Sequence, residues 1–265
     1  MINNFRFKDF YHIDDLIDIM RCLRSPGGCP WDAEQTHESI KYNLVEETYE
    51  VVEAINKNDP ELLKEELGDV LLQVVFHSQL EAEHGVFDFN NVVNGICQKL
   101  IERHPHVFGD INVKNVDEVL NNWDNIKRQS KGQDNCAQAM NSVPKELPAL
   151  IRSAKIQQKA TKAGFDWPSI DGALEKLQDE VNELKAALNS NNNENAVMEL
   201  GDVIFSAVNV SRFLNCNAEE ALTKATDKFV ERFSKVEELA AQRNIDLKSS
   251  GLDELDRLWE EVKAD

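Results

Sequence analysis

The sequence predicts an all-α protein built from two tandem helical bundles. Helical periodicity runs through most of the 265 residues, strand-like alternation bounded by turns is nearly absent, and only 11 Gly and 7 Pro interrupt the chain. A pattern of acids that occurs once in each half favours two domains. We expect an N-terminal domain over 1–133, a polar linker over 134–148 that contains Pro144 and Pro148, and a C-terminal domain over 149–265.

The periodicity predicts helices, in chain order, near 13–24, 36–57, 60–84, 88–103, 116–130, 147–162, 170–189, 194–214, 217–243 and 252–263. Residues 56–60 and 189–193 are rich in turn and cap residues, so the helices on either side of each turn should form an antiparallel hairpin. The second helix of each hairpin is apolar around much of its circumference. We expect these two helices to be central in a bundle or buried against a second subunit.

Both predicted hairpins carry the same spacing of acids. The first has Glu47, Glu50, Glu66 and Asp69, and the second has Glu180, Glu183, Glu199 and Asp202. Residues three apart share a helical face, and residues equidistant from the turn lie at the same height across a hairpin. Asn58 is the centre of the first set and Asn191 is the centre of the second. Four carboxylates should therefore meet in each hairpin and raise one another's pKa unless a cation lies between them.

A solvated helix face is the usual place for acids in a chain whose net charge is −19. Surface solubility, however, gives no reason for the same sixteen-residue interval across a turn in both halves. Metal binding is therefore favoured, and ligands that are all carboxylates indicate Mg²⁺ or Mn²⁺ rather than zinc. The candidate metal ligands are Glu46, Glu47, Glu50, Glu66 and Asp69 in the first half, and Glu180, Glu183, Glu199 and Asp202 in the second.

Basic and aromatic residues follow each acidic set at matching intervals. These are Lys99 with Arg103 and Trp123 with Lys127 in the first half, and Lys228 with Arg232 and Trp259 with Lys263 in the second. Taken singly, such residues are more often solvated cations and core tryptophans. Taken together, they supply cations for phosphates and an aromatic face for a nucleobase. These are the groups that binding of a nucleotide requires.

Composition disfavours several other functions. The net charge argues against binding to nucleic acids or acidic membranes, and five scattered Cys without a C-x-x-C pair argue against disulfides or a zinc knuckle. The N-terminus lacks a basic start followed by an apolar run, so we expect a cytoplasmic protein. Glu81-x-x-His84 has the ligand spacing of a di-iron bundle, but the second half has no matching motif, which disfavours iron.

The acidic motif Glu46-Glu47-x-x-Glu50, followed by Glu66-x-x-Asp69, resembles the signature of the MazG nucleoside triphosphate pyrophosphohydrolases, relatives of the all-α dimeric dUTPase-like enzymes. The resemblance spans nearly the whole chain and includes residues 28–32, 103–108 and 164–167. It implies hydrolysis of NTPs or dNTPs between the α and β phosphates, giving a monophosphate and pyrophosphate with Mg²⁺. It also implies two tandem MazG domains and a homodimer.

The resemblance further implies that the C-terminal domain carries most of the activity. Glu180, Glu183, Glu199 and Asp202 would then be the catalytic metal ligands, Lys228 and Arg232 would bind the phosphates, and Trp259 with Lys263 would contact the nucleotide. One position departs from the family pattern, because Met198 replaces an acid that the first half keeps as Glu65. This departure leaves open how the two domains divide the work.

The leading hypothesis is metal-assisted hydrolysis in which a carboxylate, with Glu180 as the candidate, accepts the proton of the attacking water. One alternative is a non-catalytic, metal-dependent nucleotide sensor or partner-binding helical scaffold. Another is a purely structural helical protein. The sequence does not indicate a base or sugar preference, a physiological substrate or a regulatory partner.

Overall fold

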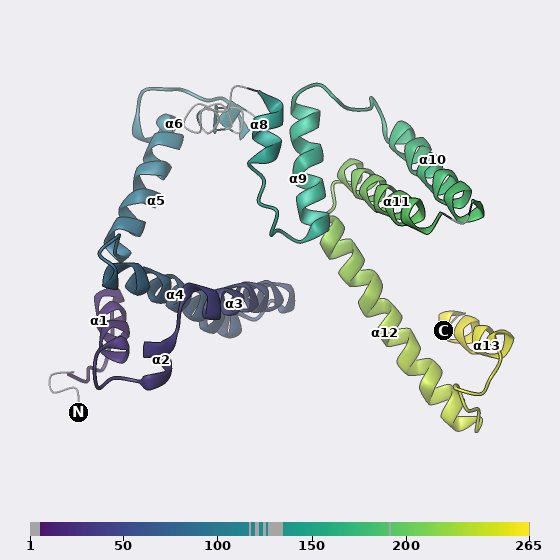
Figure 1. Cartoon of the computed structure of the whole chain (residues 1–265), viewed down its shortest axis with the longest axis horizontal. Helices are drawn as coiled ribbons and strands as arrows, with labels where there is room; N and C mark the ends of the chain where they lie inside the picture. Colours follow the sequence, from purple (N-terminus) through teal and green to yellow (C-terminus); the bar gives the residue numbers. More distant parts are fainter. Residues whose placement is uncertain are drawn as a thin grey trace. The chain divides into compact units, whose positions relative to one another are not determined.

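The computed structural model describes residues 6–116, 118, 119, 122, 123, 126, 135–190 and 192–264. Across these ranges the chain forms helices and no strand, which confirms the all-α class. The chain divides into two units, Met1–Lys127 and Arg128–Asp265 (Figure 1). Most of the helix predicted at 116–130 lies outside the described residues. Within the described part, no helix has the length and apolarity needed to span a bilayer.

The first unit is organised around one helical hairpin. Its helices are α1 (Ile13–Arg24), α2 (Pro30–Glu34), α3 (His37–Lys57), α4 (Pro60–Glu83), α5 (Phe89–Arg103) and α6 (Pro105–Phe108). Helices α3 and α4 lie along one another, and α1 packs against α4 (Figure 1). Their contact is a core of Met20, Ile40, Val75, Phe76 and Leu80. Burial of these apolar side chains holds the three helices together.

Local turn chemistry forms this hairpin. Asn58 ends α3 in the left-handed conformation, at φ 52°. Asp59 then caps α4, because its carboxylate accepts from the backbone N–H groups of Glu61 and Leu62 at 3.1 Å each, and Pro60 occupies the first helical position. A turn this short places residues equidistant from Asn58 at matching heights on the two helices.

The second unit repeats the hairpin and adds two further helix pairs. Its helices are α8 (Cys136–Asn141), α9 (Ala149–Lys162), α10 (Ile170–Asn189), α11 (Asn193–Phe213), α12 (Ala218–Gln242) and α13 (Leu252–Ala264). Helix α10 packs along α11, α8 against α9 and α13 against α12 (Figure 1). Val236, Ala240 and Leu258 form the core between α12 and α13. The short helix α8 lies within the segment predicted as a linker.

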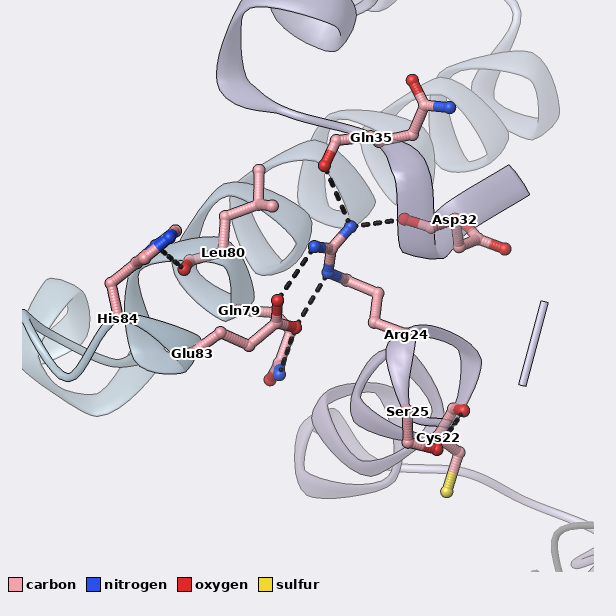
Figure 2. A network of polar contacts seen from close by, with 9 residues as sticks. All are labelled: Cys22, Arg24, Ser25, Asp32, Gln35, Gln79, Leu80, Glu83 and His84. Atoms are coloured by element: carbon pink, nitrogen blue, oxygen red, sulfur yellow. Dashed lines mark hydrogen bonds and ion pairs between the residues drawn. The ribbon is translucent and has the colours of Figure 1, made fainter. Parts of the chain in front are cut away.

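A buried arginine fastens the loop between α1 and α3 to α4 (Figure 2). Arg24 donates to both carboxylate oxygens of Glu83, at 2.8 and 2.9 Å, and to the backbone carbonyls of Asp32 and of Gln35, the latter at 3.2 Å. Its guanidinium also lies 5.3 Å from the centre of the Phe76 ring. Only 6% of the Arg24 side chain is exposed. The ion pair lowers the pKa of Glu83.

The second unit has an arginine clamp analogous to the one that Arg24 forms with Glu83 and the loop before α3. Arg212 of α11 pairs with Asp166, with one N···O distance of 2.8 Å, and also donates to Asn209. Asp166 lies beside Trp167 in the loop before α10, and a Cβ added at Gly172 would meet the Trp167 ring at 2.3 Å. An arginine thus fastens the tryptophan-containing loop before each hairpin to the second helix of that hairpin.

Candidate metal and nucleotide site

The α10–α11 hairpin brings three of its four predicted acids together. Glu180, Glu199 and Asp202 each offer a carboxylate oxygen, and these oxygens all lie within 4.8 Å of one another. Glu180 is buried, Glu199 half-buried and Asp202 exposed. Glu183, one turn along α10, is exposed and is not part of this cluster. Three close oxygens that differ in exposure can hold a divalent cation with one side open to a ligand.

A lysine that the sequence analysis missed pairs with the most buried of these acids. Lys176 lies four residues before Glu180 on α10, with Nζ 2.6 Å from Glu180 Oε1. The hydrogen bond to Glu180 raises the pKa of Lys176, and the charges of Glu183 and Asp179 add to this shift. Across the hairpin, Asn195 donates to Glu199 at 3.3 Å. The i,i+4 spacing of a Lys and a Glu on one helix was the available signal.

Replacing Lys176 by Met should make the second hairpin depend more strongly on Mg²⁺. Without its lysine partner, the buried Glu180 carboxylate lacks a compensating charge, which should lower the stability of the metal-free protein. Melting temperatures measured with EDTA and with Mg²⁺ test this, and we expect a larger Mg²⁺-induced rise in Lys176→Met than in the wild type. Lys185→Met, at an exposed position of the same helix, is the matched control. Equal rises in both variants would contradict the expectation.

The α3–α4 hairpin brings all four of its mirror-related acids together. Oxygens of Glu47, Glu66 and Asp69 lie within 4.8 Å of one another, and Glu50 hydrogen-bonds with Glu47 and Glu66. Burial, the Glu50 hydrogen bond and the charges of Asp69, Glu50 and Glu66 raise the pKa of Glu47 to about 7. Glu46, by contrast, is exposed and lies outside the cluster. Carboxylates that disfavour each other's ionisation, and that offer hard oxygen donors, fit a hard divalent cation.

The raised pKa of Glu47 predicts how stability changes with pH. A carboxyl that binds its proton more tightly in the folded state destabilises that state once it ionises. In EDTA, its contribution to the free energy of unfolding should therefore fall as the pH rises from about 4.5 to about 7, and should stay low above that range. Saturating Mg²⁺ should remove this fall. Denaturant titrations of the wild type and Glu47→Gln isolate the effect, and parallel pH profiles in EDTA would contradict it.

The predicted phosphate- and base-binding residues of the second half lie on α12 and α13. Lys228 is exposed and Arg232 half-buried, and among the described residues no ion pair joins either of them to the acidic cluster. Trp259 packs on the α12–α13 core, with its ring centre 5.2 Å from that of Phe229. Lys263 pairs with Glu260 at 3.1 Å. In the part of the chain that the structure describes, therefore, no ion pair joins these cations to the acidic cluster of the second hairpin.

The corresponding residues of the first half are only partly described. Lys99 is exposed on α5, and Arg103, at the end of the same helix, is half-buried. The Nε atom of Arg103 is buried and has no hydrogen-bond partner among the described residues. The Trp123 ring lies 6.1 Å from that of His104, and Lys127 lies outside the described residues.

Comparison with known proteins matches both hairpins to one family. The model of the MazG nucleotide pyrophosphohydrolase domain matches residues 35–108 and 169–237, segments that contain both acidic sets. The chain is 46% identical over 251 residues to the nucleoside triphosphate pyrophosphohydrolase/pyrophosphatase MazG of Thermotoga maritima, covering 95% of each chain. It is 41% identical over 254 residues to the nucleoside triphosphate pyrophosphohydrolase of Escherichia coli K12, covering 95% of this chain and 97% of that protein.

Proposed function

The chain belongs to the MazG nucleotide pyrophosphohydrolase family, and from this premise we propose that it hydrolyses nucleoside triphosphates between the α and β phosphates at the α10–α11 hairpin. The products are a nucleoside monophosphate and pyrophosphate, and the ion is Mg²⁺, with Mn²⁺ as a possible substitute. The observation that carries the proposal is the convergence of Glu180, Glu199 and Asp202 within 4.8 Å.

The acidic side chains of the α10–α11 hairpin have different proposed roles, according to their positions. A divalent cation, when bound, neutralises phosphate oxygens and lowers the pKa of a bound water. Glu199 and Asp202, on α11, are the more exposed members of the cluster and would hold a bound divalent ion. Glu180, buried beside Lys176, is our candidate to accept the proton of the attacking water. Glu183, one turn further along α10 but outside the cluster, would be a further ligand for a bound ion.

Residues of α12 and α13 complete the proposed site. Lys228 and Arg232 bind the phosphates, because their charges offset that of the departing pyrophosphate. Trp259 stacks on the base, and Lys263 contacts the nucleotide. In the first half, Lys99, Arg103, Trp123 and Lys127 are proposed to play the same parts around the α3–α4 cluster. The cytoplasmic location predicted from the sequence stays a prediction.

Product analysis tests the proposed reaction. Incubation of the full chain with dNTPs and Mg²⁺ should give deoxynucleoside monophosphate and pyrophosphate in equal amounts, and EDTA should stop the reaction. Release of inorganic phosphate with a nucleoside diphosphate would reject it. Mg²⁺-dependent nucleotide binding by calorimetry, with no monophosphate formed over hours, would favour a nucleotide sensor.

We also propose that the protein is a homodimer. The chain exposes Leu67 and Leu71 on α4, Leu200, Ile204 and Phe205 on α11, and Phe229, Val230 and Phe233 on α12. Apolar helix faces of this extent mark an interface, and a second copy of the chain supplies the complementary apolar surface. In this state we expect Lys228 and Arg232 to approach a phosphate bound at the acids of one protomer.

Light scattering after size-exclusion chromatography tests the oligomeric state. The wild type should run at twice the chain mass of 30.1 kDa. Phe205→Glu places a charge within the apolar face of α11 and should shift the protein toward the monomer, because an unpaired charge buried in an interface is costly. Lys185→Glu, on the polar surface of α10, should remain dimeric. A monomeric wild type would contradict the proposal.

A further inference from the structure

Two histidines and a glutamate connect the start of α3 to the C-terminal part of α4, away from the acidic cluster. The Nδ1 atoms of His37 and His77 lie 2.7 Å apart, and their rings are within 2° of parallel, with centres 5.0 Å apart. On its other side, His37 Nε2 lies 2.8 Å from Glu81 Oε1. His84 takes no part, because its Nδ1 donates to the backbone carbonyl of Leu80 (Figure 2).

The hydrogen bonds constrain the protons of this group. Glu81 is acceptor-only when ionised, so His37 Nε2 donates to it, and a neutral His37 then presents the lone pair of Nδ1 to His77. Two nitrogens 2.7 Å apart can share only one proton. Burial, together with the proximity of His37, lowers the pKa of His77, which favours the neutral ring of His77. Two neutral imidazoles whose Nδ1 atoms converge are the form that binds metals.

We propose that His37 and His77 bind a first-row transition-metal ion of the Zn²⁺ type through their Nδ1 atoms, with Glu81 orienting His37. Imidazole nitrogens prefer such ions to Mg²⁺. Two bonds of 2.0–2.1 Å at a tetrahedral angle place their nitrogens about 3.3 Å apart, so the two nitrogens must separate by about half an ångström and the two rings, which now face each other edge to edge, must turn toward a common point. A carboxylate behind a ligating histidine is the common second partner of such sites. On binding, His77 moves its proton from Nδ1 to Nε2.

The space beside the pair allows solvent to complete the coordination. His37, His77 and Glu81 line a cavity of about 640 Å³ that opens to solvent. Lys41, which also lines it, pairs with Glu38. Water can therefore reach the two nitrogens and fill the remaining ligand positions, as in sites that keep open coordination.

Comparison of the two hairpins supports treating His37, His77 and Glu81 as one group. The two acidic sets align with a constant offset, from Glu47 to Glu180 and from Glu66 to Glu199. With the same offset, His37, His77 and Glu81 correspond to Ile170, Val210 and Leu214. The α3–α4 hairpin has all three polar side chains, and the α10–α11 hairpin has apolar side chains at all three equivalent positions. This difference is what we expect if the three residues form one site that only the first hairpin contains. Glu47 lies ten residues beyond His37 on α3, about 15 Å away, so the two sites are separate.

Zn²⁺ titration of the full-length protein under saturating Mg²⁺, which fills the acidic clusters, tests the site. Calorimetry should show one Zn²⁺ per chain, and the ion should raise the melting temperature because it binds the folded state alone. Binding should weaken by at least about tenfold in His37→Gln and in His77→Gln, and also in Glu81→Gln through loss of orientation. Co²⁺ should give the visible absorption bands of nitrogen ligation in the wild type but not in His37→Gln or His77→Gln.

His106→Gln is the matched control, because His106 lies near a second histidine, His104, at a ring distance of 5.6 Å. This control should bind Zn²⁺ as the wild type does. His37 lies at the solvent-exposed start of α3, so His37→Gln decides the question even if His77→Gln fails to fold. Absence of Zn²⁺ binding, or unchanged binding in His37→Gln, would overturn the site.

Discussion

Glu199→Gln is expected to lower kcat/KM for dNTP hydrolysis by at least about 100-fold, and Glu66→Gln by less than about threefold. The two residues occupy matching positions in the two hairpins, and each contributes an oxygen to its acidic cluster. The substitution keeps the size of the side chain and removes one negative oxygen that would hold the ion. If dNTP hydrolysis takes place at the second hairpin, the loss of Glu199 should lower turnover and the loss of Glu66 should not.

Steady-state kinetics with pyrophosphate detection measures both effects, with circular dichroism to establish that each variant is folded. Glu66→Gln is itself the matched control, because it makes the same chemical change in the duplicate hairpin. Equal losses in the two variants would overturn the assignment of the working site to the second half. A larger loss in Glu66→Gln would move that site to the first half.

Arg24→Met should lower the free energy of unfolding by about 2–4 kcal/mol. The substitution keeps most of the apolar stem but removes the hydrogen bonds to Glu83, Asp32 and Gln35 (Figure 2). It leaves two backbone carbonyls and a partly buried carboxylate without their donor. The loop before α3 should then detach from α4, and thermal or denaturant unfolding followed by circular dichroism measures the loss.

Arg21→Met provides the comparison for this prediction. Arg21 lies one turn earlier on α1, and its ion pair with Asp18 is exposed on both sides. Exposed pairs contribute little, so this variant should change stability by less than about 1 kcal/mol. If Arg24→Met were no more destabilised than Arg21→Met, the clamp would not hold the loop.

The two hairpins could be predicted from sequence because their determinants are local. The helices expected at 36–57 and 60–84 are observed as His37–Lys57 and Pro60–Glu83. Asn58, Asp59 and Pro60 are the residue types that end one helix and start the next, and helical geometry then sets the heights of the acids. The convergence of Glu47, Glu66 and Asp69 follows from these two facts. This convergence could be predicted without knowing any contact between residues far apart in the sequence.

Other features of the structure depend on how the helices pack against one another. The spacing of residues along a single helix does not determine this packing. The contact between His37 and His77 joins residues forty positions apart and depends on the rotation of α3 against α4. The position of Lys228 relative to the acids depends on how α12 leaves the second hairpin. The short helices α2, α6 and α8 have too few residues to show a period of 3.6. The exposure of Glu183 likewise reflects the packing of α10 on α11.

The most direct test of the account is a crystal structure of the full chain with Mn²⁺ and a dNTP analogue that cannot be cleaved between its α and β phosphates. Anomalous scattering should place Mn²⁺ among the oxygens of Glu180, Glu199 and Asp202, with the α-phosphate of the analogue beside it. Mn²⁺ and analogue bound only at the α3–α4 hairpin, or bound away from both acidic clusters, would contradict it.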